Sequence, residues 1–448
     1  MARTIADVLL QFKGDVAKAL SAEAILRVCG EIEHRWRHRL LDPVTTVHLF
    51  LLQILHGNIS CCGLRRIAAN AVSATAYCNA RTRLPLTLFE KLLQGVVEAL
   101  TPKTNDTGRW HGHRTWTMDG SSFSMPDTPA LQKHFGQPSA QSKGCGFPVA
   151  HLLALFHAGT GLLLQIAAAP LRTHDMSQAA ATHPALEPGD ILIADRGLAS
   201  FAHLALLFLR KAHAVFRCHQ KQIVSFRTGR KHTGKSKPRK GQPRSRWIRR
   251  LGKNDQLVEY FKPKAKPVWM SKPDYAALPD ALTVREIRYN TPQPGRRTRV
   301  ITLVTTLLDA KSYPAAELAS LYEQRWQVEV NLRHLKTTMN MEVLHCKTVD
   351  GVLKELLMFA LAYNLVRLVM LEASRRQQVP LKRISFVDAL RWLRTAEPGS
   401  AMPSLIVNPS RPGRFEPRVR KRRPKQYPLM TKPREKLRKS MGKRRKIA

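Results

Sequence analysis

The pattern of apolar residues changes near residue 113, and this change restricts the folds open to the chain. Before it, apolar side chains recur at i, i+3 and i+4, which predicts amphipathic helices. After it, short alternating or continuous apolar runs are typical of strands, separated by helical patterns. The resulting β-β-β-α-β-α order predicts an α/β sheet with helices on its faces. The segments are helices at 15–29, 42–55 and 85–100, strands at 113–119 and 148–171 (two strands), a helix at 175–187, a strand at 190–195, a helix at 198–212, and a strand at 214–219.

The chain departs from this order between residues 220 and 310. Residues 226–250 are strongly basic and rich in Gly and Pro, which predicts a mobile loop that follows DNA backbone. Three more strands are expected at 256–261, 283–290 and 297–308. Helices then follow, one beginning near Pro314, a long apolar one at 351–373 and a short amphipathic one at 385–396.

The charge balance limits the possible partners. The 448 residues include 74 Lys and Arg against 32 Asp and Glu, a formal net charge of +42. Such an excess opposes compaction unless a polyanion screens it, so nucleic acid is the expected partner and a membrane surface the weaker alternative. No membrane span is expected, because Asn364 and Arg367 interrupt the most apolar run. The sequence has no secretory signal pattern and no phosphate-binding loop for ATP. Its seven cysteines lack framework spacing, as in a cytoplasmic protein.

A row of polar residues marks the helix that begins near Pro314. Arg325, Glu329 and Lys336 follow Tyr322 at spacings that put all four side chains within an arc of roughly 60°. Apolar residues on a neighbouring stripe would pack on the core. One carboxylate among phosphate-binding groups suits phosphodiester chemistry, although a solvated salt-bridge face gives a similar pattern.

Two further carboxylates, Asp119 and Asp195, are expected at the ends of strands. Side chains at strand ends can converge at one edge of an α/β sheet. Together with Glu329 they could hold two Mg²⁺ ions, which take oxygen ligands and assist phosphodiester cleavage. A single aspartate at a strand end is more often a cap or turn residue, so the prediction depends on convergence.

These segments resemble the transposases of bacterial insertion elements, specifically the DDE group with a Y-R-E-K signature. The resemblance covers roughly residues 110–340 and is carried by Asp119, by Ala194-Asp195-Arg196-Gly197 and by the spacing from Tyr322 to Lys336. It implies an RNase H-like core with a β-rich insertion just before the catalytic glutamate. The expected strands between residues 220 and 310 fit that insertion.

The resemblance also implies roles for single residues. Asp119, Asp195 and Glu329 would bind two Mg²⁺ ions, for which Mn²⁺ can substitute. Tyr322, Arg325 and Lys336 would hold DNA phosphates, and Arg196 would contact DNA or pair with a carboxylate. A tryptophan of the insertion can stack on a flipped base in this family. Trp247 and Trp269 are the candidates here, with a local core role as the alternative for either.

We therefore expect a DNA transposase that cleaves element ends and joins the freed 3′-OH to target DNA, as a homodimer on double-stranded DNA in the bacterial cytoplasm at the nucleoid. The expected domains are a helical DNA-binding domain (1–108), the catalytic core (109–345, insertion 220–310), C-terminal helices (346–408) and a basic disordered tail (409–448). The alternatives are an RNase H-like nuclease without strand transfer and a non-catalytic basic nucleic-acid-binding protein.

Overall fold

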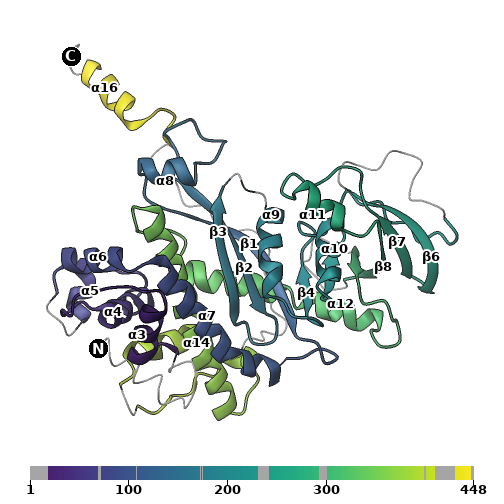
Figure 1. The fold of residues 1–448 in the computed structure, drawn as a ribbon, viewed down its shortest axis with the longest axis horizontal. Coiled ribbons are helices and arrows are strands. Elements are labelled where there is room, and N and C mark those ends of the chain that lie inside the picture. Colours follow the sequence, from purple (N-terminus) through teal and green to yellow (C-terminus); the bar gives the residue numbers. More distant parts are fainter. Residues whose placement is uncertain are drawn as a thin grey trace.

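A nine-stranded sheet runs through the molecule (Figure 1). The computed structural model describes residues 19–68, 72–106, 108–171, 173, 175–230, 242–291, 300–397, 400–408 and 429–444. Its strand order is β3-β2-β1-β4-β5-β9-β8-β7-β6. The strands are β1 (Thr115–Ser124), β2 (Val149–His157), β3 (Leu163–Pro170), β4 (Ile191–Ala194), β5 (His213–Arg217), β6 (Arg244–Gly252), β7 (Asp255–Phe261), β8 (Ala281–Asn290) and β9 (Val300–Thr305).

The first five strands form the RNase H-like core. β1 and β2, and β2 and β3, pair antiparallel, whereas β1, β4 and β5 run parallel. Parallel neighbours require crossover connections. The chain supplies them with α9 (Asp175–Thr182) before β4 and α10 (Phe201–Leu209) between β4 and β5. The fold class expected from the alternation of elements is confirmed.

The N-terminal and C-terminal helices share one hydrophobic core against the sheet. Phe89 of the N-terminal half, Phe156 of β2 and Phe359 of the C-terminal half are all fully buried in the same cluster. The predicted helices before residue 108 are present, and within the described residues they pack against the later helices rather than around a core of their own. These helices are α3 (Ala22–Glu31), α4 (Pro43–Leu55), α5 (Cys61–Ile67), α6 (Ala74–Arg83), α7 (Leu86–Asp106), α14 (Val349–Arg376) and α15 (Phe386–Thr395).

The two polar residues that interrupt the apolar run of α14 fasten this helix to the hairpin between β2 and β3. Asn364 accepts a hydrogen bond from the backbone N–H of Leu163 at 2.8 Å and donates to its carbonyl at 2.9 Å. Arg367 donates from Nε to the carbonyl of Thr160 at 2.9 Å. α14 is long and apolar enough to cross a membrane, but 89% of its apolar window is buried inside the molecule. It is the core helix that the sequence predicts.

The β-rich insertion extends the core sheet instead of forming a sheet of its own. β9 pairs antiparallel with both β5 and β8, and β7 and β6 follow outward, with α11 (Lys272–Ala277) beside them. The prediction of a loop over residues 226–250 is wrong for its last part. Arg244–Gly252 forms strand β6, because it pairs with β7. Residues 231–241 of that segment lie outside the described residues.

The helix predicted from Pro314 to Lys336 is divided in three. It comprises α12 (Ala315–Glu323), α13 (Trp326–Arg333) and a π-helical turn, η2 (His334–Thr338). In the segment predicted as a disordered tail, the structure has a helix, α16 (Arg434–Arg444), which extends away from the body (Figure 1). Residues 409–428 and 445–448 lie outside the described residues. The remaining short elements are α8 (Pro129–His134), η1 (His183–Ala185) and η3 (Leu381–Arg383).

Candidate active site

Asp119 lies within β1, and this corrects the expectation that the strand ends there. β1 continues to Ser124 because it pairs with β2 along its whole length, with Asp119 opposite Ala154. Its parallel pairing with β4 stops at Met118, so Asp119 is the first residue of β1 beyond the end of β4. Asp119 Oδ1 accepts a hydrogen bond from the N–H of Gly120 at 2.8 Å.

Asp195 follows the last residue of β4 directly, as predicted. Side chains alternate between the two faces of a strand, so Asp195 follows Ile191 and Ile193 on one face of the sheet. The side chains of both isoleucines pack with Tyr322 of α12 on that face. The loop after Asp195 is tight: the N–H of Gly197 donates to Asp195 Oδ1 at 2.7 Å. A Cβ at residue 197 would stand 2.9 Å from that oxygen, so only glycine leaves the carboxylate in this position.

Arg325 joins the helix to the sheet. Its guanidinium is 3.4 Å from Asp119 Oδ2 through Nη1 and 3.2 Å from Glu329 Oε1 through Nη2. Asp119 in β1 and Glu329 in α13 therefore lie on either side of a single group, although 210 positions separate them in the sequence numbering. The turn between α12 and α13 places Arg325 immediately before α13.

The carboxylates influence each other electrostatically. Burial raises the pKa of Asp119 to about 6, Arg325 opposes this rise, and the nearby charges of Asp195 and Glu329 add to it. Burial lowers the pKa of Arg325, but Tyr322, Asp119 and Glu329 outweigh this and hold it above its ordinary value. The three predicted carboxylates thus share one region of negative charge with a permanent cation inside it.

The other two members of the polar row also face this region. Lys336 donates from Nζ to Ser121 Oγ at 3.1 Å, which places its ammonium two residues along β1 from Asp119. Tyr322 is 6% exposed, and burial raises the pKa of its phenol, with the charges of Arg325 and Asp195 also acting on it. The row is therefore directed at the sheet, so it is not a purely solvated face.

The site offers oxygen ligands of the type that a divalent cation needs. Three carboxylates supply the hard oxygen ligands that Mg²⁺ prefers. Among the described residues no three side chains of His, Cys, Asp or Glu are arranged so that they could hold a metal ion together. At this site Arg325 lies between two of the carboxylates. The residues fit the cation in type and charge, and binding would require the guanidinium to move aside.

The remaining predicted DNA contacts are dispersed. Arg196 is exposed next to Asp195, and both act on the pKa of His219, so it borders the site. Trp247 lies on edge strand β6, six strand positions from β1, or roughly 29 Å at ~4.8 Å per strand. Trp269 stacks on His203 with ring centroids 5.0 Å apart and packs against the core. Trp269 is half-buried, and this packing fits the local core role that is the alternative to base stacking.

Two residues near the carboxylates were missed by the sequence reasoning. Ser121 receives the hydrogen bond of Lys336, and its alternate spacing from Asp119 in a strand could have indicated a shared face. Trp326 is 57% exposed although it is a large apolar side chain, and it directly follows Arg325. At ~100° per residue Trp326 lies about 40° from Tyr322, beside the polar row, so helical spacing could have indicated it.

Known proteins resemble this chain over most of its length. A model of the transposase DDE domain family matches residues 110–365, more than half of the chain. The chain is 26% identical over 343 residues to the transposase InsG for insertion sequence element IS4 of Escherichia coli (strain K12), covering 72% of this chain and 71% of that protein.

Other relatives match over shorter stretches. The probable transposase for insertion sequence element IS5377 of Geobacillus stearothermophilus is 36% identical over 89 residues, covering 20% of this chain and 23% of that protein. A cryo-EM structure of the piggyBac transposase synaptic complex with hairpin DNA aligns with a TM-score of 0.45 and 11% identity, over 85% of this chain and 79% of that one. From the family match and the fold, the chain belongs to the DDE-domain transposases and is a DNA transposase.

Proposed function

We propose that Asp119, Asp195 and Glu329 are the catalytic carboxylates and hold two Mg²⁺ ions, for which Mn²⁺ can substitute. The observation that supports this most is the placement of Arg325 between Asp119 and Glu329, with Asp195 close enough to affect the same carboxyl group. When bound, the ions assist attack on a phosphodiester and stabilise the leaving oxygen. Members of the DDE family generally depend on divalent metals, so the chemistry fits the family.

The protein's own cations hold the DNA. Arg325 and Lys336, with Arg196 at the rim, bind phosphates beside the scissile bond as charge-assisted donors. Tyr322 stays protonated because it is buried, which suits a positioning role and not a nucleophile. Hydrolysis of a phosphodiester at the element's end frees a 3′-OH and leaves a 5′-phosphate on the other side of the break. That hydroxyl then attacks a phosphate of target DNA or of the opposite strand, forming a new phosphodiester and releasing the 3′ oxygen of the attacked strand as its leaving group. No covalent enzyme intermediate is needed.

The wider assembly is part of the same proposal. Two element ends must be held together for transposition, so a homodimer on double-stranded DNA is the working unit, acting in the bacterial cytoplasm at the nucleoid without ATP. Trp247 remains the candidate for base stacking from the insertion. The N-terminal helices, residues 1–108, act as the DNA-binding region, and the basic segment 409–448 adds phosphate contacts.

A glutamine substitution tests the site. Glu329→Gln should bind element-end DNA as the parent does and lose Mg²⁺-dependent cleavage by at least about 100-fold, because one metal ligand loses its charge. Glu342→Gln, an exposed glutamate of the same chain, is the matched control. Cleavage of labelled element ends is followed on denaturing gels. Parent-like cleavage by Glu329→Gln would overturn the assignment.

Strand transfer separates this function from a nuclease of the same fold. Pre-cut element ends are incubated with target plasmid and Mg²⁺, and joined products are counted. Joining is expected to need the same carboxylates as cleavage. Absence of joined product under conditions that support cleavage would favour a nuclease without strand transfer.

A further inference from the structure

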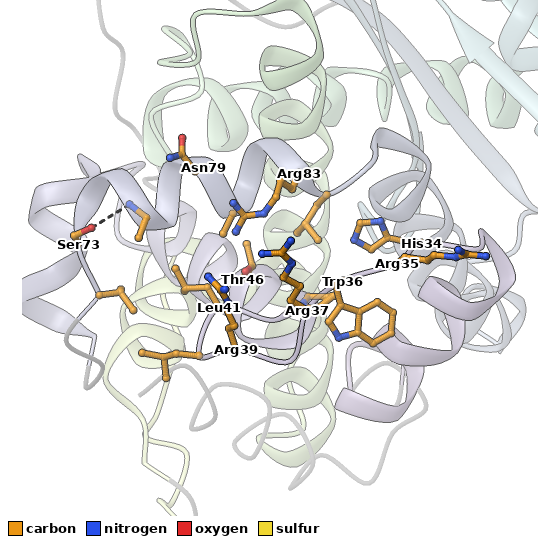
Figure 2. A pocket seen from close by; sticks show the side chains of 16 residues that line it. His34, Arg35, Trp36, Arg37, Arg39, Leu41, Thr46, Ser73, Asn79 and Arg83 are labelled. Carbon is orange, nitrogen blue, oxygen red and sulfur yellow. Dashed lines mark hydrogen bonds between the residues drawn. The ribbon is translucent and has the colours of Figure 1, made fainter.

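A hollow of about 950 Å³ opens among the N-terminal helices, apart from the catalytic carboxylates. It lies between the α3–α4 loop and α6. Figure 2 shows Arg37, Arg39 and Arg83 gathered toward its middle, with His34 and Trp36 at one end. We call it the arginine groove. The lining residues on which the argument rests are His34, Arg35, Trp36, Arg37, Arg39 and Arg83.

The charges of this groove are not balanced by the protein. It is lined by four arginines and by no aspartate or glutamate. Within the described residues, the guanidiniums of Arg35, Arg37, Arg39 and Arg83 form no recorded ion pair. Four cations that converge without counter-charges repel one another, and a bound polyanion would relieve this repulsion.

A second hollow of the same helices provides an internal comparison. It measures about 380 Å³ and is lined by Arg27, Lys91, Glu31 and Glu98 among other residues. There the cations are paired: Lys91 Nζ is 2.7 Å and Arg27 Nε 3.8 Å from carboxylate oxygens of Glu31. The cations of this second hollow therefore have counter-charges beside them, whereas the arginine groove has no acidic residue in its lining.

Aromatic rings lie beside the cations. The rings of His34 and Trp36 are stacked with centroids 6.0 Å apart, and His38 makes an edge contact with Trp36 at 5.9 Å. These residues alternate in sequence with Arg35, Arg37 and Arg39, so the loop carries a row of rings beside a row of guanidiniums. Cations that follow a backbone next to rings that stack on sugars or bases are the combination used to bind nucleic acid strands.

We propose that the arginine groove binds the sugar-phosphate backbone of DNA, with its arginines on phosphates and Trp36 against a sugar or base, as an anchoring site separate from the catalytic carboxylates. The groove is suited to contacts with the DNA backbone and not to reading the base sequence. Most of its polar groups are guanidiniums, which donate hydrogen bonds to phosphates. This inference rests on DNA being the substrate, as for a transposase. It gives the N-terminal helices a defined contact surface.

The test is equilibrium binding of a fluorescein-labelled 40-bp duplex of mixed sequence to the full chain, in EDTA so that no cleavage occurs. The double variant Arg37→Gln/Arg39→Gln removes two central cations of the groove. Arg65→Gln/Arg66→Gln removes two exposed cations of α5 outside the groove and is the control for net charge. Affinity is measured by anisotropy across a series of salt concentrations.

The groove variant should bind at least about ten-fold more weakly and show a salt slope smaller by roughly 1.8, the value for two lost phosphate contacts. The control should change both quantities much less. Trp36→Ala should also weaken binding, and Trp36→Phe should restore it, because an aromatic face is retained. Thermal unfolding of each variant verifies the fold.

Equal losses in the groove and control variants would mean that only overall charge matters and would overturn the proposal. Unchanged binding in the groove variant would also overturn it and leave an acidic protein segment as the occupant to examine. The catalytic proposal is judged separately by Mg²⁺-dependent cleavage. Loss of cleavage in Glu329→Gln, together with intact DNA binding in the groove variant, would therefore reject only this inference.

Discussion

Arg325 is the residue that holds Asp119 and Glu329 beside each other. It separates two carboxylates that would otherwise repel each other, and its own side chain is only 16% exposed. A cation that binds the same carboxylates must replace its charge. Arg325 would then be available to a DNA phosphate, which links ion binding to substrate binding through one side chain.

Replacing this arginine should make the fold depend more on the ion. Arg325→Ala is expected to lower the stability of the metal-free protein by about 1 kcal/mol, because Asp119 and Glu329 lose their counter-charge while partly buried. Mg²⁺ should then raise the melting temperature of the variant more than that of the parent. Differential scanning fluorimetry with and without Mg²⁺ measures this, with exposed Arg333→Ala as the control. If Mg²⁺ raised the melting temperatures of the parent and of Arg325→Ala equally, Arg325 would not act as the counter-charge of these carboxylates.

The glycine after Asp195 and Arg196 provides a second test at the residue scale. In Gly197→Ala the new Cβ would displace the Asp195 carboxylate, which is the nearest atom in its path. Cleavage is expected to fall at least about ten-fold, since a misplaced catalytic group costs rate, while the melting temperature changes little. Gly95→Ala, which has open space around it in α7, is the matched control. Full activity of Gly197→Ala would show that the turn does not orient Asp195.

At the scale of elements, α14 connects parts of the chain that are distant in sequence. Its apolar faces fill the core shared by the N-terminal helices and the sheet, and Asn364 and Arg367 bind backbone of the β2–β3 hairpin. Tyr363 extends this pattern, since its hydroxyl donates to the carbonyl of Gly161 at 2.8 Å. The helix thus fixes the edge of the sheet by hydrogen bonds as well as by packing.

Removing one of these polar groups should destabilise the fold. Asn364→Leu leaves the N–H and carbonyl of Leu163 without their side-chain partner in a buried place, at a cost of about 2–3 kcal/mol. Urea unfolding measures the loss. Gln94→Leu, whose exposed side chain in α7 donates to Glu98 Oε1 at 2.8 Å, is the comparison and should cost far less. Similar losses at both positions would show that the hairpin contact is unimportant.

At the scale of the whole molecule, buried histidines make stability depend on pH. His157 is fully buried, and the N–H of Thr160 donates to its Nδ1 at 3.2 Å. Burial, aided by Arg114 and Arg109, lowers its pKa from 6.5 to about 4. Burial also lowers the pKa of His183 to about 4 and that of His334 to about 3. The unfolded chain therefore takes up protons before the folded one does.

Stability should accordingly be complete above pH 6.5 and fall as the pH drops from 6.5 through about 4. His157→Asn, which keeps an acceptor for Thr160, should be less stable than the parent at pH 7. The difference in unfolding free energy should shrink by up to about 3 kcal/mol toward pH 4. Only the parent has His157, so only the parent loses the stability that depends on keeping this imidazole neutral. Urea unfolding at a series of pH values measures it, with exposed His38→Asn as the control. A difference that is constant with pH would contradict this origin.

The sequence alone determined the local elements and the identity of the chemical groups. The alternation of strands and helices after residue 113 predicted the core correctly, because side-chain periodicity reports which face of an element is buried. The spacing of Tyr322, Arg325, Glu329 and Lys336 likewise indicated a common face, and the resemblance to transposases supplied the function. These properties depend on neighbouring residues, and neighbours are visible in a sequence.

Only the tertiary structure decided how distant segments meet. Nothing local to Asp119 shows that β1 continues past it, since that depends on pairing with β2. Strand pairing with β7 likewise made part of the basic segment into β6, and Trp269 stacks on His203 at the border of the core. The contact of Arg325 with Asp119 and the unpaired arginines of the groove depend on long-range packing. Packing free energy, summed over residues far apart in the chain, set these positions.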